Sequence, residues 1–492
     1  MKNKNLLAFL LIFAILLGSC GASDNTDKTV SDTVSDNTTA SDTDELSDGL
    51  DKYNGAFEGF EFRVEASEGN YRYVDVEDNM SDIVDQTVYR RNLAVEERFG
   101  CDIVIAYTDP KWENCRDYIT RTVLSGEDLF DLAYHHAVSL GLIASSDYLL
   151  NWYDVPNVNF ERPWWSDSTV NNLSYDNKCF IAIGDYALTA FSNAYCVYYN
   201  KNDAEIYGLP NLYEVVKNGD WTLDYMLSLA AEIYVDENRN NKVDDEDYFG
   251  YVSDAKSCMN AYLWAFDNPI LSNTADGIEV SFKTEKITDI VTRLVNLTAE
   301  GDIRTNPTYK NSTNGGSFDY GVEMFAREKA LFANGYIAQS LIHLRDMSDN
   351  YGILPYPKWN AEQESYYTMA DGNHAALGIP KTVSEERLEF VGAMVEALCA
   401  ESYKILKPAY YDEALKLKGT RDDESIEMMD IITDSIIYDM GYIYDGFKGC
   451  SFFVQNLVQS GNPNFESYWA ANSGVALEWY DTVIEYFEDY SG

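Results

Sequence analysis

The alternation of apolar and polar residues predicts strands and helices in turn from about Tyr53 onward. Residues 60–64 and 101–105 have the pattern of strands. Between them, residues 83–95 repeat apolar positions every three or four residues, which predicts a helix that Gly100 ends. Further strands are predicted at 129–133, 180–183 and 195–199. This alternation favours an α/β fold with largely buried sheets.

The first twenty residues have the pattern of an export signal. A short cationic start precedes an apolar run from Leu6 to Leu17, which has the length of a signal-peptide core and is short for a membrane span. The run leads into Leu-Gly-Ser-Cys ending at Cys20, which resembles a bacterial lipobox. We therefore expect residues 1–19 to be cleaved and Cys20 to be lipidated. The mature protein would be anchored by lipid to the outer face of the cytoplasmic membrane.

Residues 20–52 differ in amino-acid composition from the rest of the chain. They are mostly Ser, Thr, Asp and Asn with few apolar side chains. Such a segment buries too little apolar surface to fold, so we predict a disordered tether between the lipidated cysteine and the body.

The charge of the chain restricts the partners that it can bind. Its net charge is −46, from 82 acidic and 36 basic residues. Nucleic acid is excluded as a partner, because phosphate binding depends on Lys and Arg. Neutral, cationic or metal-containing ligands fit this charge better than anionic ones.

The cysteines beyond Cys20 do not form a recognisable framework. Their number is odd, their spacing is irregular and no Cys-x-x-Cys occurs, so the sequence predicts neither a set of disulfides nor a zinc site. We expect most of them to be small buried side chains. They are Cys101, Cys115, Cys179, Cys196, Cys258, Cys399 and Cys450.

Several segments together resemble a known family. Tyr199-Asn200-Lys201 follows an apolar strand and precedes a Gly-Leu-Pro ending at Pro210 and a helix that begins near Trp221. The order of these segments resembles extracellular solute-binding proteins of the sugar-binding type (family 1), which are lipoproteins of ABC transporters. Further matching segments are Pro163-Trp164-Trp165, Gly184-Asp185 and residues 352–358.

The resemblance implies an α/β, two-lobed periplasmic-binding-protein-like fold of type II with crossing segments as a hinge. The first lobe would span 53–187 and be completed by about 366–410, the second would span 188–365, and residues 411–492 would form a helical region across the lobes. Crossings are expected near 185–192 and 355–365. A monomer would close on a carbohydrate between its lobes and deliver it to the transmembrane subunits of an ABC permease.

An acidic loop at 236–247 has the spacing of an EF-hand calcium loop. Oxygen side chains stand at loop positions 1, 3, 5, 9 and 12, and position 7 would offer its backbone carbonyl. Asn241 replaces the usual Gly at position 6, and Asp replaces Glu at position 12. We expect one structural Ca²⁺, with a solvated acidic loop as the alternative. The predicted ligands are Asp236, Asn238, Asn240, Lys242, Asp244 and Asp247.

The candidate sugar-binding residues are aromatic side chains, which stack on sugar rings, and polar ones, which read hydroxyl groups. For each residue the alternative is core packing or a solvated loop. The candidates are Trp164, Trp165, Asp185, Trp264, Asn334, Tyr336, Asn373 and His374.

Three functions compete for this sequence. A binding protein of an oligosaccharide importer is the first, and a glycan-capture or sensor-associated lipoprotein without a permease is the second. A secreted glycoside hydrolase is the third, and catalysis is not expected, because no metalloprotease, Ser-hydrolase or phosphate-binding motif occurs. Peptides and sugar acids stay open as ligand classes.

Overall fold

The structure is a computed structural model that describes residues 47–77, 80, 82–275, 277–300, 304, 319–416 and 423–490. The predicted signal peptide 1–19, the lipidation site Cys20 and most of the predicted tether lie outside the described residues. Among those residues, no helix combines the length and the apolar character needed to cross a membrane.

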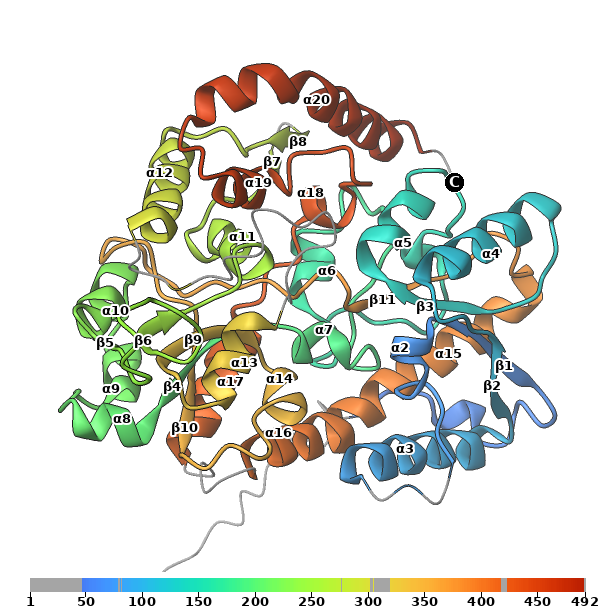
Figure 1. Cartoon of the computed structure of the whole chain (residues 1–492). Helices are drawn as coiled ribbons and strands as arrows, with labels where there is room; N and C mark the ends of the chain where they lie inside the picture. The colour runs from blue at the N-terminus through green and yellow to red at the C-terminus, as the bar shows by residue number, and fades with distance from the viewer. Residues whose placement is uncertain are drawn as a thin grey trace, which may run out of the picture. The chain divides into compact units, whose positions relative to one another are not determined.

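The first sheet has four strands in the order β11-β3-β1-β2 (Figure 1). β1 pairs in parallel with β2 and β3, and β11 pairs antiparallel with β3. The strands predicted at 60–64 and 101–105 are confirmed, whereas the one predicted at 129–133 lies a few residues later. The strands are β1 (Glu61–Ala66), β2 (Asp102–Tyr107), β3 (Leu132–His136) and β11 (Ala375–Gly378).

Helices flank this first sheet. The predicted helix at 83–95 is confirmed as α3, which Asp82 caps by accepting the N–H of Val84 at 2.9 Å. Gly100 ends α3 with a φ of 77°, a conformation that favours glycine. α4 and α5 pack against β3, and α15 packs against α3. These helices are α2 (Glu68–Tyr71), α3 (Ile83–Phe99), α4 (Trp112–Ser125), α5 (Ala137–Ala144) and α15 (Glu385–Glu401).

The second sheet has five strands in the order β10-β4-β9-β6-β5. β4 and β6 are buried along their whole length, because each is an interior strand with neighbours on both edges. The strand predicted at 195–199 is confirmed as β4. The strands are β4 (Tyr195–Asn200), β5 (Tyr234–Val235), β6 (Tyr248–Val252), β9 (Ala330–Tyr336) and β10 (Tyr351–Leu354).

Short helices surround the second sheet, and a separate hairpin, β7 (Leu271–Thr274) with β8 (Gly277–Val280), lies outside it. α13 packs against β9, and α10 packs against β6. The helices are α8 (Lys201–Ile206), α9 (Leu212–Lys217), α10 (Leu223–Ala230), α11 (Ser257–Ala265), α12 (Glu285–Glu300), α13 (Tyr320–Ala326) and α14 (Gln339–Ile342).

The chain passes between the two sheets twice. It reaches β4 through α6 (Asp167–Asn171) and α7 (Thr189–Ser192), and it returns from β10 to β11. The numerical boundaries of the lobes stay a prediction. The strand predicted at 180–183 is wrong: its residues are buried, but Ala182 alone pairs, in one bridge with Leu377. The segment is apolar because it is buried, and it does not pair with a neighbouring strand along its length.

The C-terminal helices contact elements that belong to both sheets. α17 packs against β10, α18 against α5, and α19 against α11 and α12. Residues 402–406 form one π-helical turn between α15 and α16. The helices are α16 (Lys407–Lys416), α17 (Asp423–Asp434), α18 (Met440–Ile443), α19 (Phe453–Ser460) and α20 (Phe465–Asp489).

The folded body begins before the predicted end of the tether. Leu50 is only 2% exposed, and Asp51–Tyr53 form a short 3₁₀ helix. Asp48 makes an ion pair with Arg98 on α3. The predicted tether therefore extends too far along the chain, because its last residues pack on the first sheet's helices.

Candidate ligand-binding cleft

A cavity of about 280 Å³ lies where both sheets, a crossing segment and the C-terminal region meet. Its volume is near the lower end of the range for small-molecule sites. The side chains that line it come from the end of β3, the start of β4, α11, the segment before β11, and the C-terminal region. Those used below are His136, Tyr195, Lys256, Asn260, Asp371, Asn373, Phe447, Phe452 and Gln455.

Aromatic rings stack on one another at the cavity: His136, Phe447 and Phe452 line it, and Trp112 stacks on two of these rings without lining it. Trp112, at the start of α4, stacks on His136 with 4.8 Å between ring centroids and 19° between planes. The Trp112 ring also stacks on Phe447 at 6.0 Å, and Phe447 stacks on Phe452 at 6.1 Å. Phe447 is 52% exposed and has a φ of 60°. An exposed aromatic ring on a left-handed backbone is costly, which makes this residue a candidate for ligand contact.

His136 is a neutral member of this stack of rings. Its Nδ1 accepts the N–H of Ser139 at 3.2 Å, so the ring proton lies on Nε2. Burial, aided by the neighbouring His135 and His374, lowers the pKa of His136 to about 3. The ring is therefore an uncharged stacking surface with a hydrogen-bond donor.

The cavity lining also carries polar groups that hydrogen bonds hold in place. Asp371 accepts the hydroxyl of Tyr195 at 2.6 Å, and its other oxygen accepts the Asn373 backbone N–H at 3.0 Å and side-chain amide at 2.7 Å. Asn260 accepts the backbone N–H of Gln455 at 3.2 Å. Positioned carboxylate and amide groups of this kind read hydroxyl groups.

The start of α11 adds Lys256 to the lining. Buried Asp254 accepts the backbone N–H of Lys256 at 2.6 Å and that of Cys258 at 3.0 Å. Burial raises the pKa of Asp254 to about 6. The cavity lining thus combines one lysine, the carboxylate of Asp371 and neutral aromatic rings, a mixture that suits an uncharged polar ligand.

Of the predicted ligand-binding residues, Asn373 lines the cavity. Its neighbour His374 is buried behind it, and the His374 backbone carbonyl accepts the N–H of Ala137 at 2.9 Å. Burial lowers the pKa of the His374 ring to about 4.

The two tryptophans of the Pro-Trp-Trp motif lie in the core. The Trp164 indole donates to one oxygen of Glu396 at 3.0 Å, and the Trp165 indole donates to the other at 2.8 Å. Both rings are buried on α15. They hold a buried carboxylate, and they do not line the cavity.

The predicted residues of the second lobe also lie outside the cavity lining. Trp264 is buried and donates to Asp439 at 2.8 Å, and Asn334 is buried and accepts the hydroxyl of Tyr251. Tyr336 lies next to the cavity, since its ring centroid is 6.2 Å from that of Tyr195.

Asp185 lies at the predicted crossing but not in the cavity. One carboxylate oxygen is 3.5 Å from the ammonium of Lys407, and the other is buried with no hydrogen-bond partner among the described residues. Burial raises the pKa of Asp185 to about 6, against the attraction of Lys407.

Sequence reasoning missed Trp112, Phe447, Phe452 and Asp371. These residues are far apart in the chain, and only the fold brings them together. Asp371 precedes Asn373 in an Asp-Gly-Asn turn, a pattern that marks a polar loop. That turn is a local signal that could have extended the Asn373 prediction to Asp371.

The acidic loop at 236–247 folds with its side-chain oxygens turned toward its own backbone and amides. Asp236 accepts the N–H groups of Asn240 and Asn241 at 3.1 and 2.8 Å. Asp244 accepts the side-chain amides of Asn238 and Asn240 at 3.0 and 2.7 Å. Asn241 has a φ of 59°, the conformation for which a glycine is usual at this position.

Asp247 closes this loop. Its Oδ2 accepts the hydroxyl of Tyr234 and the N–H of Asp244, both at 2.9 Å. Its Oδ1 is buried and has no hydrogen-bond partner among the described residues. A buried carboxylate oxygen without a donor fits the final ligand of a calcium loop.

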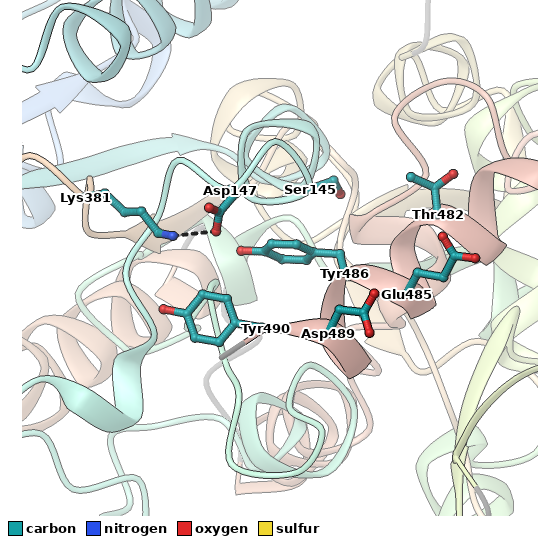
Figure 2. Close-up of a pocket in the computed structure, with 8 residues that line it drawn as sticks. All are labelled: Ser145, Asp147, Lys381, Thr482, Glu485, Tyr486, Asp489 and Tyr490. Atoms are coloured by element: carbon teal, nitrogen blue, oxygen red, sulfur yellow. Dashed lines mark hydrogen bonds and ion pairs between the residues drawn. The ribbon is translucent and has the colours of Figure 1, made fainter. Parts of the chain in front are cut away.

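A second, larger depression of about 400 Å³ lies between α20 and the turn after α5. Figure 2 shows the rings of Tyr486 and Tyr490 near the Lys381–Asp147 ion pair, with Asp489 nearby. Its lining comes from 145–147, Lys381 and α20, without residues of the second sheet. The cavity between the sheets is therefore the better candidate for a ligand that controls closure.

Comparison with known proteins shows the fold. No protein-family model matches the chain, and no curated protein matches it significantly. Solved structures with a similar fold include an ABC transporter solute-binding protein from Thermotoga lettingae bound to α-D-tagatose (15% identity, TM-score 0.52, 86% of this chain and 100% of that one). An ABC substrate-binding protein from Listeria monocytogenes in complex with cycloalternan is similar as well (11% identity, TM-score 0.53, 88% of this chain and 100% of that one).

A third similar structure is the GacH receptor of Streptomyces glaucescens, solved unliganded and with acarbose (12% identity, TM-score 0.54, 88% of this chain and 100% of that one). The α/β fold of type II that the sequence predicted is thereby confirmed. At these identities the likeness establishes the fold, and the ligand must be argued from the cavity.

Proposed function

We propose that this protein is the non-catalytic, carbohydrate-binding component of an ABC importer and takes an oligosaccharide between its lobes. The observation that supports this most is the run of stacked rings from His136 through Trp112 and Phe447 to Phe452, three of which line the cavity together with Asp371 and Asn373. A sugar ring offers an apolar face to such rings and hydroxyl groups to such amides and carboxylates. The similar fold of sugar-bound proteins supports the same ligand class.

Thermal unfolding against a panel of oligosaccharides, sugar acids and peptides tests the ligand class. A ligand at 100 times its dissociation constant adds about 2.7 kcal/mol to the free energy of unfolding, which raises the melting temperature by about a few degrees. We expect neutral glycans to produce this shift. A shift with peptides alone, or cleavage of the glycan during the assay, would contradict the proposal.

We propose further that the bound form delivers its sugar to a permease. Uptake of the labelled sugar by cells should then be lost when this protein is deleted and be restored by the full chain. Sugar binding with unchanged uptake would favour the capture or sensor lipoprotein instead.

We propose that Cys20 is lipidated after cleavage of residues 1–19. Mass spectrometry of the membrane fraction should find the lipid on an N-terminal cysteine, and Cys20→Ser should release the protein from the membrane. Recovery of Cys20→Ser in the membrane would refute the lipid anchor.

We propose that the loop at 236–247 binds one structural Ca²⁺ through the predicted ligand set. The side chains of Asp236, Asn238, Asn240, Asp244 and Asp247 and the carbonyl of Lys242 would hold it. The buried Asp247 oxygen without a donor supports this, because a cation would satisfy it. Chelator should lower the melting temperature of the wild type but not of Asp236→Asn. Glu246→Gln is the control, since its ion pair with Arg327 at 3.8 Å is solvent-exposed and contributes little.

A further inference from the structure

Three side chains with metal-binding atoms meet in the core of the first sheet and its helices. Glu65 lies on β1, Cys115 on α4 and His135 on β3, and each is fully buried. One carboxylate oxygen, the thiol sulfur and one ring nitrogen lie within 4.8 Å of one another. Because the three residues come from three separate elements, their sequence spacing shows no zinc motif.

Four polar atoms of this cluster have no hydrogen-bond partner among the described residues. They are both carboxylate oxygens of Glu65 and both ring nitrogens of His135. Glu65 Oε1 and His135 Nδ1 are 3.4 Å apart, which is too far for a good hydrogen bond between them. A buried polar group without a partner costs about 1–3 kcal/mol, so four in one place require an explanation.

The charge of the cluster points to a cation. The carboxylate of Glu65 is fully buried and no Lys or Arg forms an ion pair with it among the described residues. A divalent cation would stabilise both the thiolate and the carboxylate in this apolar surrounding.

We propose that Glu65, Cys115 and His135 bind one Zn²⁺ ion inside the first lobe. Sulfur, imidazole nitrogen and a single carboxylate form a donor set that suits zinc, whereas Ca²⁺ and Mg²⁺ take oxygen ligands. On binding, Cys115 releases its proton to solvent and a bond forms between its sulfur and the ion. The thiolate and the carboxylate then balance the two charges of the metal.

Small movements of the three side chains are enough to bring their ligand atoms onto one ion. Zinc bonds of about 2.0–2.3 Å place ligand pairs about 3–4 Å apart, so modest side-chain rotations bring the three atoms onto one ion. The ion would join β1, β3 and α4, and His135 precedes the cavity residue His136. Zinc would therefore hold the end of β3, with the cavity residue His136, in place, whichever ligand the cleft binds. Since the site is shut off from solvent, the ion enters as the chain folds.

Refolding with defined metals tests the site. The full chain is refolded with Zn²⁺ or Co²⁺ in the presence of excess Ca²⁺, which keeps the loop at 236–247 from taking the test metal. After exchange into metal-free buffer we expect one Zn²⁺ per chain and a higher melting temperature than after refolding with chelator. The Co²⁺ form should show the near-ultraviolet sulfur-to-cobalt charge-transfer band of a thiolate ligand.

Cys115→Ser should abolish the charge-transfer band, and His135→Gln should abolish tight zinc retention. Cys101→Ser, which alters another buried thiol of the same lobe, should change neither result. Wild-type protein that refolds without retaining zinc and without a thiolate band would overturn the proposal. So would a band that persists in Cys115→Ser. The wild-type measurement decides the question even if a variant does not fold.

Discussion

At the scale of single residues, the cleft depends on aromatic side chains that the core does not need. Trp112 is partly exposed and Phe447 is more than half exposed, yet both stack on a neighbouring ring. The tryptophans expected in the cleft from sequence, Trp164 and Trp165, are buried instead. A sequence shows that a tryptophan is present, but whether its ring faces the core or a cavity depends on distant segments.

Trp112→Ala removes the ring that stacks on both His136 and Phe447. Trp112 does not itself line the cavity, but it stacks on two rings that do, and losing an aromatic stacking contact costs about 0.5–1.5 kcal/mol. Because the two lining rings lose this support, we expect sugar affinity to fall by up to about tenfold. Titration calorimetry on the sugar found in the panel measures this. Tyr207→Ala, at an exposed tyrosine directly after α8, is the matched control and should bind as the wild type does. Equal sugar affinity of Trp112→Ala and the wild type would show that this ring does not contribute to sugar binding.

Glu396 gives the stability a defined pH dependence. Burial raises the pKa of Glu396 from 4.5 to about 7, although the two indole donors partly offset this. The folded state therefore favours the protonated form. The contribution of Glu396 to the free energy of unfolding is full below pH 4.5 and falls by about 3 kcal/mol as the pH rises through 7.

Glu396→Gln should abolish this component of the pH dependence. Urea unfolding between pH 4 and 8 compares the wild type with Glu396→Gln and with Glu97→Gln, an exposed carboxyl on α3. The unfolding free energy of the wild type should fall relative to Glu396→Gln as the pH rises, and Glu97→Gln should follow the wild type. A difference between wild type and Glu396→Gln that is constant over this range would contradict the assignment.

At the scale of elements, the close packing of α5 on α18 ties the first sheet to the C-terminal region. Gly141 on α5 allows this contact, because a Cβ there would lie 1.9 Å from the Ile443 carbonyl oxygen. Gly141→Ala should therefore destabilise the protein by about 1–3 kcal/mol. Gly474→Ala, on the open face of α20, meets no atom within 4 Å and should be neutral or stabilising by about 0.5–1 kcal/mol. Urea denaturation measures both, and equal effects would show that α5 and α18 do not pack this closely.

The prediction of elements succeeded where the apolar pattern coincides with regular backbone hydrogen bonding, in a helix or between strands. β1, α3 and β4 have clear periodicity and local stop signals such as Gly100, and all three form as predicted. The segment at 180–183 failed because burial alone made it apolar. The start of the body was placed too late, since Asp48 gains its ion-pair partner, Arg98, only from α3 and Leu50 is buried only in the folded protein.

At the scale of the whole molecule, the resemblance in the sequence predicted the type II fold, and the structural comparisons confirm it. The site was less accessible to prediction. Asn373 lines the cavity, but the stack of aromatic rings is assembled from α4, β3 and residues 447–452, which no sequence window contains. The cluster of Glu65, Cys115 and His135 was missed for the same reason.

The structure of the sugar complex is the most direct test of where and how this protein binds its ligand. We expect the sugar between the two sheets, with a ring face against Phe447 or Phe452 and hydroxyl groups on Asp371 and Asn373. A sugar in the depression beside α20, at Tyr486 and Tyr490, with the cavity between the sheets empty, would contradict the account.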